Sequence, residues 1–268
     1  MKRFATFFLF ITLSLFSMNK GFAAEFSLVK SPYTVSFHGC VENKQPLLLN
    51  APVRLFSLLD QAQPTDCAFL KGSYWLDPAL IPQQTALKNK LQTQIKSLVV
   101  SAEQQNNHDL TRHLRILLQQ VNAMPVTGRH LPSELTPYLV ETRPYANRLL
   151  TSEAFLYFPR EPRHVNFIGF RKPEMLYFST QSLSDYVGKN DLKPFYERGW
   201  VYHVLPNGKI EYLKVGYWTH DTTHPAPGSV VVGKLDASVF RHSDDIDFDQ
   251  ETYHRTLTQW LATQVLPL

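Results

Sequence analysis

Apolar residues recur at helical spacing in two neighbouring stretches of the chain. In the first they fall at i, i+4, i+8, i+11, i+12 and i+15, on one face of a helix: Leu87, Leu91, Ile95, Leu98, Val99 and Ala102. A polar turn follows, ending in the N-cap residue Asn107, before a second such face: Leu110, Leu114, Leu117, Leu118 and Val121. Two helices joined by a short polar turn predict an αα-hairpin over about residues 82–122.

Strand-like alternation precedes and follows this hairpin. Before it, runs at 33–37 and 47–49 lead into a short helix around 53–59. After it, a capped helix start occurs at 182–187, among strand-like runs at 155–158, 165–170, 175–178, 201–205, 210–215 and 229–232. The turn Pro206-Asn207-Gly208 is a strong hairpin signal. The order strand, strand, helix therefore occurs twice, which indicates an α+β chain.

A proline-bounded segment and a last helix complete the predicted organisation. The sequence Pro-Arg-Glu-Pro at 159–162 is typical of a stiff linker, so we place one domain at 24–160 and a second at 161–243. In the remaining segment, 244–268, we expect a helix from Gln250 to Leu266 whose start is capped by Asp247 or Asp249. Its apolar face should pack on the second domain: Tyr253, Leu257, Trp260, Leu261 and Val265.

The first 23 residues have the pattern of a secretion signal. Lys2 and Arg3 precede an apolar run of about 13 residues, and Gly21-Phe22-Ala23 supplies small residues for cleavage. Such a run is too short for a membrane span, which needs roughly 20 residues. We expect cleavage after Ala23, or alternatively after Ala24, and a mature chain located outside the cytoplasm without stable membrane insertion.

Charge and cysteine content narrow the classes of partner and compartment. Loss of the signal removes Lys2, Arg3 and Lys20 but no acid, so the 27 basic residues fall to 24 against 23 acids. A nearly neutral chain gives no reason to expect nucleic acid as a partner. Cys40 and Cys67 are the two cysteines, and in an oxidising compartment they predict a disulfide, the alternative being two unpaired thiols.

The sequence Thr127-Gly128-Arg129 directly follows the predicted hairpin. Glycine adopts backbone angles closed to other residues, and arginine presents a planar fork of five donors, so this turn is a candidate for gripping an anion or a sugar. The alternative is that Arg129 is an exposed charge after a turn. Across 129–172, seven basic residues, Arg148 among them, alternate with aromatics such as Tyr138, a mixture that suits an acidic glycan. Strand-core aromatics and solvated arginines are the alternative for that group.

Motifs for catalysis and metal binding are weak. His220 and His224 lie four residues apart but in a proline-rich loop, while Asp245, Asp247 and Asp249 begin a calcium-loop spacing that lacks its required glycine and glutamate. Asp185 and Glu197 are isolated acids with no spacing that defines a glycosidase pair. The sequence has no Gly-x-Ser-x-Gly or phosphate-loop motif. We therefore expect no metal, no cofactor and no catalytic activity.

A succession of short motifs resembles the GfcC-type capsule biosynthesis family. They occur in the same order over most of the mature chain: Tyr74-Trp75-Leu76, Thr127-Gly128-Arg129, Ser182-Leu183-Ser184-Asp185-Tyr186, Pro206-Asn207-Gly208, Trp218 and Pro225-Ala226-Pro227-Gly228-Ser229. The resemblance implies two tandem β-grasp domains, a helical hairpin inserted in the first and a C-terminal amphipathic helix packed on the second. The Cys40/Cys67 pair and the His-rich loop at 220–224 depart from the family pattern.

The resemblance also implies a function. It implies a Gram-negative periplasmic protein, without known catalytic activity, that acts in assembly or export of a surface polysaccharide. Arg129 matches an arginine that lines a central pocket in the family, and we take as candidate binding residues Thr127, Gly128, Arg129, Tyr138 and Arg148. The expected partners are polysaccharide or the outer-membrane export machinery. A glycan-active enzyme and a small-ligand sensor are the alternative functions. On this basis Arg129→Ala should lose function while folding survives.

Overall fold

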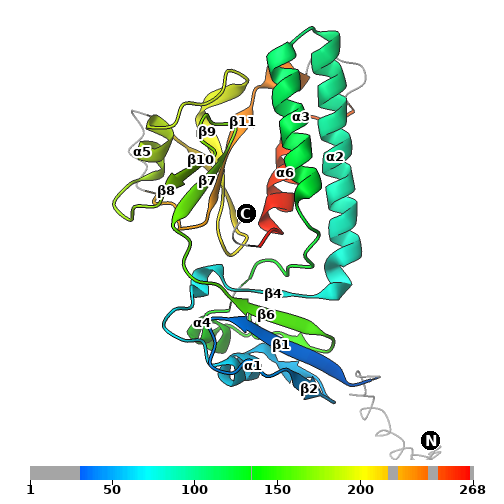
Figure 1. Ribbon diagram of the computed structural model, residues 1–268, viewed down its shortest axis with the longest axis vertical. Coiled ribbons are helices and arrows are strands. Elements are labelled where there is room, and N and C mark those ends of the chain that lie inside the picture. Colours follow the sequence, from blue (N-terminus) through cyan, green and yellow to red (C-terminus); the bar gives the residue numbers. More distant parts are fainter. Residues whose placement is uncertain (1–30, 134, 217–222, 241–246, 266–268) are drawn as a thin grey trace, which may run out of the picture.

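The computed structural model of the chain describes residues 31–133, 135–216, 223–240 and 247–265 (Figure 1). Four features named above lie outside the described residues, namely the predicted signal at 1–23, Trp218, His220 and Asp245, and so does a further strand-like stretch of the sequence at 26–29. The described part of the chain forms an α+β structure with two main sheets and a long helical hairpin. One sheet lies in the lower half of Figure 1 and the other in the upper half.

The first sheet contains four strands in the order β2-β1-β6-β4. Its two central strands run parallel and its two outer strands are antiparallel to them: β1 (Tyr33–Gly39), β2 (Leu47–Leu49), β4 (Tyr74–Leu76) and β6 (Ala154–Phe158). Helices α1 (Leu55–Ala62) and α4 (Pro137–Thr142) contribute side chains to its core. A separate two-stranded ribbon pairs β3 (Val53–Arg54) with β5 (Leu149–Leu150).

The second sheet contains five strands in the order β10-β9-β11-β7-β8. Its first and last strands in the chain, β7 and β11, are again parallel neighbours, and the other pairs are antiparallel. The strands are β7 (His164–Ile168), β8 (Glu174–Leu176), β9 (Tyr196–Val204), β10 (Ile210–Lys214) and β11 (Val230–Leu235). Helix α5 (Leu183–Gly188) follows β8 and begins with a capping box of Ser182 and Asp185.

Strand β11 is buried on both faces, which explains its unbroken run of valines. Val231 packs in the core on the α5 side of the sheet, whereas Val230 and Val232 belong to the larger core on the opposite side. Alternate residues of a strand point to opposite faces, so a strand covered twice must be apolar throughout.

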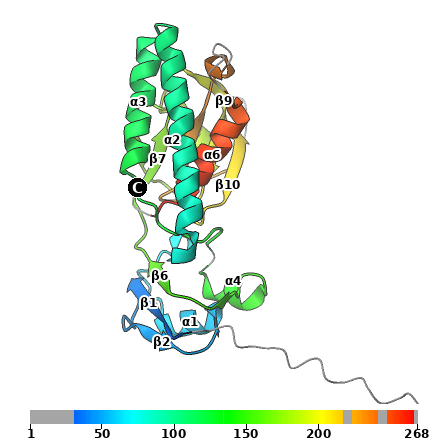
Figure 2. The same cartoon turned by 90° about the vertical axis from the view of Figure 1, so that its right-hand side faces the viewer.

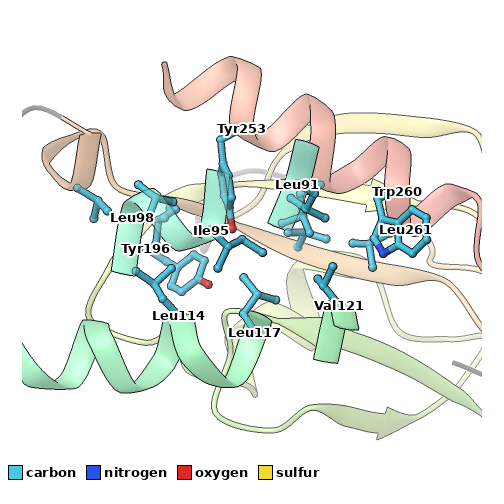
Figure 3. Close-up of a cluster of buried hydrophobic side chains, with 14 of the residues drawn as sticks. Leu91, Ile95, Leu98, Leu114, Leu117, Val121, Tyr196, Tyr253, Trp260 and Leu261 are labelled. Atoms are coloured by element: carbon cyan, nitrogen blue, oxygen red, sulfur yellow. The ribbon is translucent and has the colours of Figure 1, made fainter. Parts of the chain in front are cut away.

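The helical hairpin packs against the second sheet although it lies, in sequence, between two strands of the first. The hairpin consists of α2 (Ile81–Gln104) and α3 (His108–Ala123). Helix α6 (Gln250–Ala262) lies between that sheet and α2, while α3 reaches the sheet directly, where His113 contacts Tyr196 (Figures 1 and 2). Their apolar faces meet in one core, where Leu91, Ile95 and Leu98 lie near Tyr253 and Trp260 (Figure 3). Asn107 caps α3 and Asp249 caps α6.

Three local predictions differ from the structure. Helix α6 ends at Ala262 rather than at the predicted Leu266, because Arg129 binds the carbonyl oxygens of Ala262 and Gln264. Val265, expected on the helical face, therefore lies past the helix end. Strand β4 and helix α4 were absent from the sequence-based expectation, since three and six residues are too few to display a period.

Cys40 and Cys67 form a disulfide with their Cα atoms 5.7 Å apart, which confirms the disulfide predicted from the sequence. The bond joins the end of β1 to the loop that precedes the short 3₁₀ turn Leu70–Gly72. Two further 3₁₀ turns, Pro78–Leu80 and Ala237–Phe240, lie before α2 and after β11. Within the described ranges, no helix is long and apolar enough to cross a membrane.

Candidate functional site

The Thr127-Gly128-Arg129 segment lies where the first sheet, the hairpin and the end of α6 meet. The amide of His130 donates to the carbonyl of Trp75 at 3.0 Å, and the amide of Asp77 donates to the carbonyl of Gly128 at 2.8 Å. These bonds, with a bridge between Leu76 and Arg129, place the segment beside β4. The chain thus returns from the hairpin onto the edge of the first sheet.

Gly128 is required by both backbone angle and space. Its φ is +73°, and a Cβ built there would come within 2.6 Å of the carbonyl oxygen of Asp77. Its amide donates to Gln84 Oε1 on α2 at 2.8 Å, while Gln84 Nε2 donates to the carbonyl of Arg129 at 2.8 Å. The hydroxyl of Thr127 donates to the carbonyl of Thr263 at 2.7 Å. The turn is therefore bonded to both α2 and the end of α6.

The guanidinium of Arg129 is bound by backbone carbonyls of the second half of the chain. Nη1 donates to Gln264 at 2.5 Å and to Ala262 at 3.3 Å, and Nη2 donates to Pro206 in the turn between β9 and β10. Nε donates to Ser133 Oγ at 3.3 Å. Because the C-terminal carbonyls of a helix carry partial negative charge, a cation at the end of α6 is favourably placed.

Burial decides between the alternatives for Arg129. The residue is 3% exposed, so the alternative of an exposed surface charge is wrong. Its guanidinium lies over the ring of Tyr74 at 5.2 Å from the ring centre. Burial lowers the pKa of Arg129 to about 10, which keeps it protonated at neutral pH. The same burial raises the pKa of the Tyr74 hydroxyl. Arg129 thus acts as a buried cation that organises three parts of the chain.

A cavity of about 220 Å³ lies beside this segment, and three of the side chains that line it are exposed to solvent: Tyr145, Arg148 and Lys209. It is lined from the first part of the chain by Trp75, Pro132, Tyr145 and Arg148, and from the β9–β10 turn by Asn207 and Lys209. Tyr145 is 73% exposed. An aromatic surface next to two basic side chains suits a sugar ring that carries a carboxylate, since arginine binds carboxylates with directional, charge-assisted bonds.

The ring of His130 contacts two residues that line this cavity, Trp75 and Arg148. Its ring stacks on Trp75 with ring centres 4.3 Å apart and an interplanar angle of 8°. Burial and the neighbouring charge of Arg148 lower the pKa of His130 to about 4, so the ring is neutral at neutral pH. Its Nε2 then accepts a hydrogen bond from Arg148 Nη1 at 2.7 Å. Arg148 is therefore oriented over the cavity by a half-buried histidine.

The predicted site residues divide into three groups. Thr127, Gly128 and Arg129 come together in the buried junction, and Arg148 lines the adjacent cavity. Tyr138 lies on α4, is 69% exposed and does not line this cavity. Sequence reasoning assigned no role to three other residues of the site: Gln84, His130 and Lys209. It placed Tyr145 only among the aromatics interleaved with the basic residues of 129–172, and Asn207 only in a turn. Besides the Thr127-Gly128-Arg129 segment and Arg148, the Tyr74-Trp75-Leu76 and Pro206-Asn207-Gly208 motifs pointed toward this region.

The acids considered for catalysis each have a structural partner. Asp185 caps the first turn of α5 through Ser182, and this hydrogen bond lowers the pKa of its carboxyl group. Glu197 on β9 forms an ion pair with Lys234 at 2.8 Å and accepts a hydrogen bond from Gln250. Asp249 caps α6. Among the described residues no group of three or more His, Cys, Asp or Glu side chains is arranged to hold a metal ion.

Comparison with known proteins places this architecture in a family. The model of the N-terminal part of the capsule biosynthesis protein GfcC matches residues 32–161, and the model of its C-terminal part matches residues 172–259. The chain belongs to the GfcC capsule biosynthesis family. It is also similar to the uncharacterized protein YjbG of Escherichia coli (strain K12), with 27% identity over 180 residues, which cover 66% of this chain and 73% of YjbG.

Proposed function

We propose that this member of the GfcC family is a non-catalytic periplasmic protein that binds an acidic polysaccharide during assembly or export of a capsule. Family membership supports the role in capsule biosynthesis. The observation that carries the binding role is the cavity at the junction, where the exposed ring of Tyr145 lies beside Arg148 and Lys209. Aromatic faces cover the apolar faces of sugar rings, and the two cations complement carboxylates on the polymer.

We also propose that each main sheet belongs to a β-grasp domain, with the boundary in the linker at 159–162. In both sheets the first and last strands are parallel central neighbours, and a short helix follows the first two strands. The domain containing the first sheet carries the hairpin as an insertion. In this arrangement the cavity lies between the domains, because Arg148 comes from the first and Lys209 from the second.

The periplasmic location rests on two independent features. The N-terminal sequence has the pattern of a cleavable signal. The Cys40–Cys67 disulfide is suited to an oxidising compartment, since such bonds are rare in the cytosol. Fractionation of cells followed by mass determination of the mature N-terminus tests this location, and a cytosolic protein that retains residues 1–23 would contradict it.

Binding is tested with oligosaccharides prepared from the polysaccharide of the source strain. We expect calorimetric titration of the mature protein to give saturable binding that weakens with salt and falls at least tenfold in Arg148→Gln/Lys209→Gln. The matched control is Arg112→Gln/Lys214→Gln, which removes the same charge from exposed positions away from the cavity. Equal affinity in both double variants would exclude the cavity as the binding site. Shortening of the oligosaccharides on incubation would instead show an enzyme.

The cellular role is tested by deleting the gene and measuring surface polysaccharide. We expect displayed polymer to fall and to be restored by the wild-type protein and by the control double variant. The cavity double variant should accumulate to normal levels and fail to restore display. Normal display in the deletion strain would contradict the proposed role in assembly or export.

A further inference from the structure

A second, larger cavity of about 680 Å³ lies on the face of the second sheet that the hairpin covers. Its walls come from α3, from β7 with the turn that follows it, and from the chain that leaves α6. Most of this surface is apolar, and the apolar side chains that line it include Ile116, Ile168 and Val265. The volume falls within the range of roughly 300–1,000 Å³ that is usual for ligand cavities.

A hydrogen-bonded chain of three side chains reaches this cavity, and two of its members, Lys193 and His113, line it. Lys193 Nζ lies 3.1 Å from His113 Nδ1, and His113 Nε2 lies 2.6 Å from the hydroxyl of Tyr196. An ammonium group only donates hydrogen bonds, so Nδ1 accepts and Nε2 must carry the proton that is donated to Tyr196. The imidazole is therefore neutral. Burial and the charge of Lys193 lower the pKa of His113 to about 4, in agreement with this assignment.

The charge of Lys193 is not balanced by an acid within the described ranges. No carboxylate there lies within ion-pair distance of its Nζ, and its one recorded hydrogen-bond partner is the neutral His113. Of the other charged residues that line the cavity, Arg171 is paired with Asp191 and Glu174 is exposed on β8. A partly buried ammonium beside apolar walls favours an anion as its partner.

We propose that this cavity binds an amphiphilic anion, with a carboxylate or phosphate group at Lys193 and a hydrocarbon part along the apolar walls. The cation would bind the charged head group, and the apolar walls would bury a chain of methylene groups. Each buried methylene tightens binding by roughly fourfold. This inference is independent of the polysaccharide cavity, which lies at the junction of the two sheets and shares no lining residue with this one.

The proposal is tested by calorimetric titration of the mature protein with four probes below their micellar concentrations. Decyl phosphate and decanoate should bind, whereas decanol, which lacks the charge, and inorganic phosphate, which lacks the chain, should bind at least tenfold more weakly. The stronger of the two anions identifies the head group. Equal affinity for decanol and both anions, or no binding by any chain-bearing probe, would overturn the proposal.

Two variants locate the site. Lys193→Met should weaken decyl phosphate and decanoate at least tenfold and leave decanol unchanged, while Lys189→Met, which removes an exposed lysine outside the cavity, should change neither. Ala123→Trp adds bulk at an exposed position on the cavity wall and should abolish binding of both anions without affecting the fold. If Lys193→Met does not fold, Ala123→Trp decides alone: unchanged anion binding in that variant would place the ligand elsewhere.

Discussion

At the scale of single residues, Arg129 shows how a charged side chain can hold distant parts of the chain together without being exposed to solvent. Its donors are occupied by Ser133 and by backbone carbonyls of the β9–β10 turn and of the end of α6. The motif in the sequence identified the residue, but its partners lie up to 135 positions away. The accessible chemistry lies instead beside it, on the exposed side chains of Tyr145 and Arg148.

Arg129→Ala tests the organising role. Removing the guanidinium leaves three buried carbonyls without a donor, and hydrogen bonds to charged groups contribute roughly 1.5–3 kcal/mol each. We expect the free energy of unfolding to fall by about 3 kcal/mol in urea titrations. The sequence-based expectation for this variant, that function is lost while folding survives, stays a prediction, to which the structure adds this loss of stability. Arg148→Ala, at an exposed arginine, is the control and should shift stability by less than about 0.5 kcal/mol.

Gly128→Ala separates backbone strain from side-chain chemistry in the same turn. The new Cβ would lie 2.6 Å from a backbone oxygen at a φ of +73°, so we expect a loss of more than about 1 kcal/mol in the free energy of unfolding. Gly188→Ala is the matched control, because a Cβ there meets nothing within 4 Å. Equal stability of the two variants would contradict the close approach of Gly128 to Asp77.

At the scale of elements, α6 is held between the second sheet and helix α2 of the hairpin. Its His254 is fully buried: Nε2 accepts from the amide of Leu235 at 2.9 Å, and Nδ1 donates to the carbonyl of Gln250 at 2.8 Å. This pattern requires a neutral ring, because protonation would turn the acceptor toward Leu235 into a second donor. Burial lowers the pKa of His254 to about 4.

The stability of α6 docking should therefore depend on pH. Between the unfolded pKa near 6.5 and the folded pKa of about 4, the unfolded chain binds a proton at His254 that the folded chain does not. The free energy of unfolding must then fall as pH falls through this window, by up to about 1.4 kcal/mol per pH unit from this residue. In urea titrations from pH 6.5 to 5, His254→Gln should flatten the dependence. His108→Gln, at an exposed position, should leave the slope unchanged.

At the scale of the whole molecule, the hairpin belongs to one half of the chain in sequence and to the other in space. It leaves the first sheet after β4, covers α6 and the second sheet, and returns at Gly128 (Figures 1 and 2). Its apolar residues share a core with Tyr253 and Trp260. The relative position of the two sheets is thus fixed by side-chain packing and by the bonds of Arg129, in addition to the linker.

Expression of residues 24–160 alone tests this arrangement. Without the second sheet and α6, the hairpin would expose side chains that are fully buried in the intact protein, such as Leu91, Ile95 and Leu98. We expect the fragment to self-associate and to bind a hydrophobic dye, as measured by light scattering and fluorescence. The same fragment with 82–122 replaced by a Gly/Ser linker should be monomeric. A monomeric, dye-free fragment that retains the hairpin would contradict the shared core.

Local periodicity in the sequence was sufficient for much of this description. It determined the two hairpin helices, the start of α6, the strands with clear alternation and the repeated strand, strand, helix order, because each of these depends on residues a few positions apart. The cysteine pair and the Gly128-Arg129 turn were also visible, since residue type alone restricts their chemistry.

The tertiary structure alone decided which surfaces meet. Only the structure shows that residues 74–76 form strand β4 and that α6 ends at Ala262. Only the structure shows, too, that the hairpin packs on the second sheet and that Arg129 is buried. The bonds responsible join Thr127 to Thr263 and Arg129 to Gln264, residues 136 and 135 positions apart. A periodic pattern records which face of an element is apolar but not which partner covers it, so contacts at this separation follow only from the folded chain.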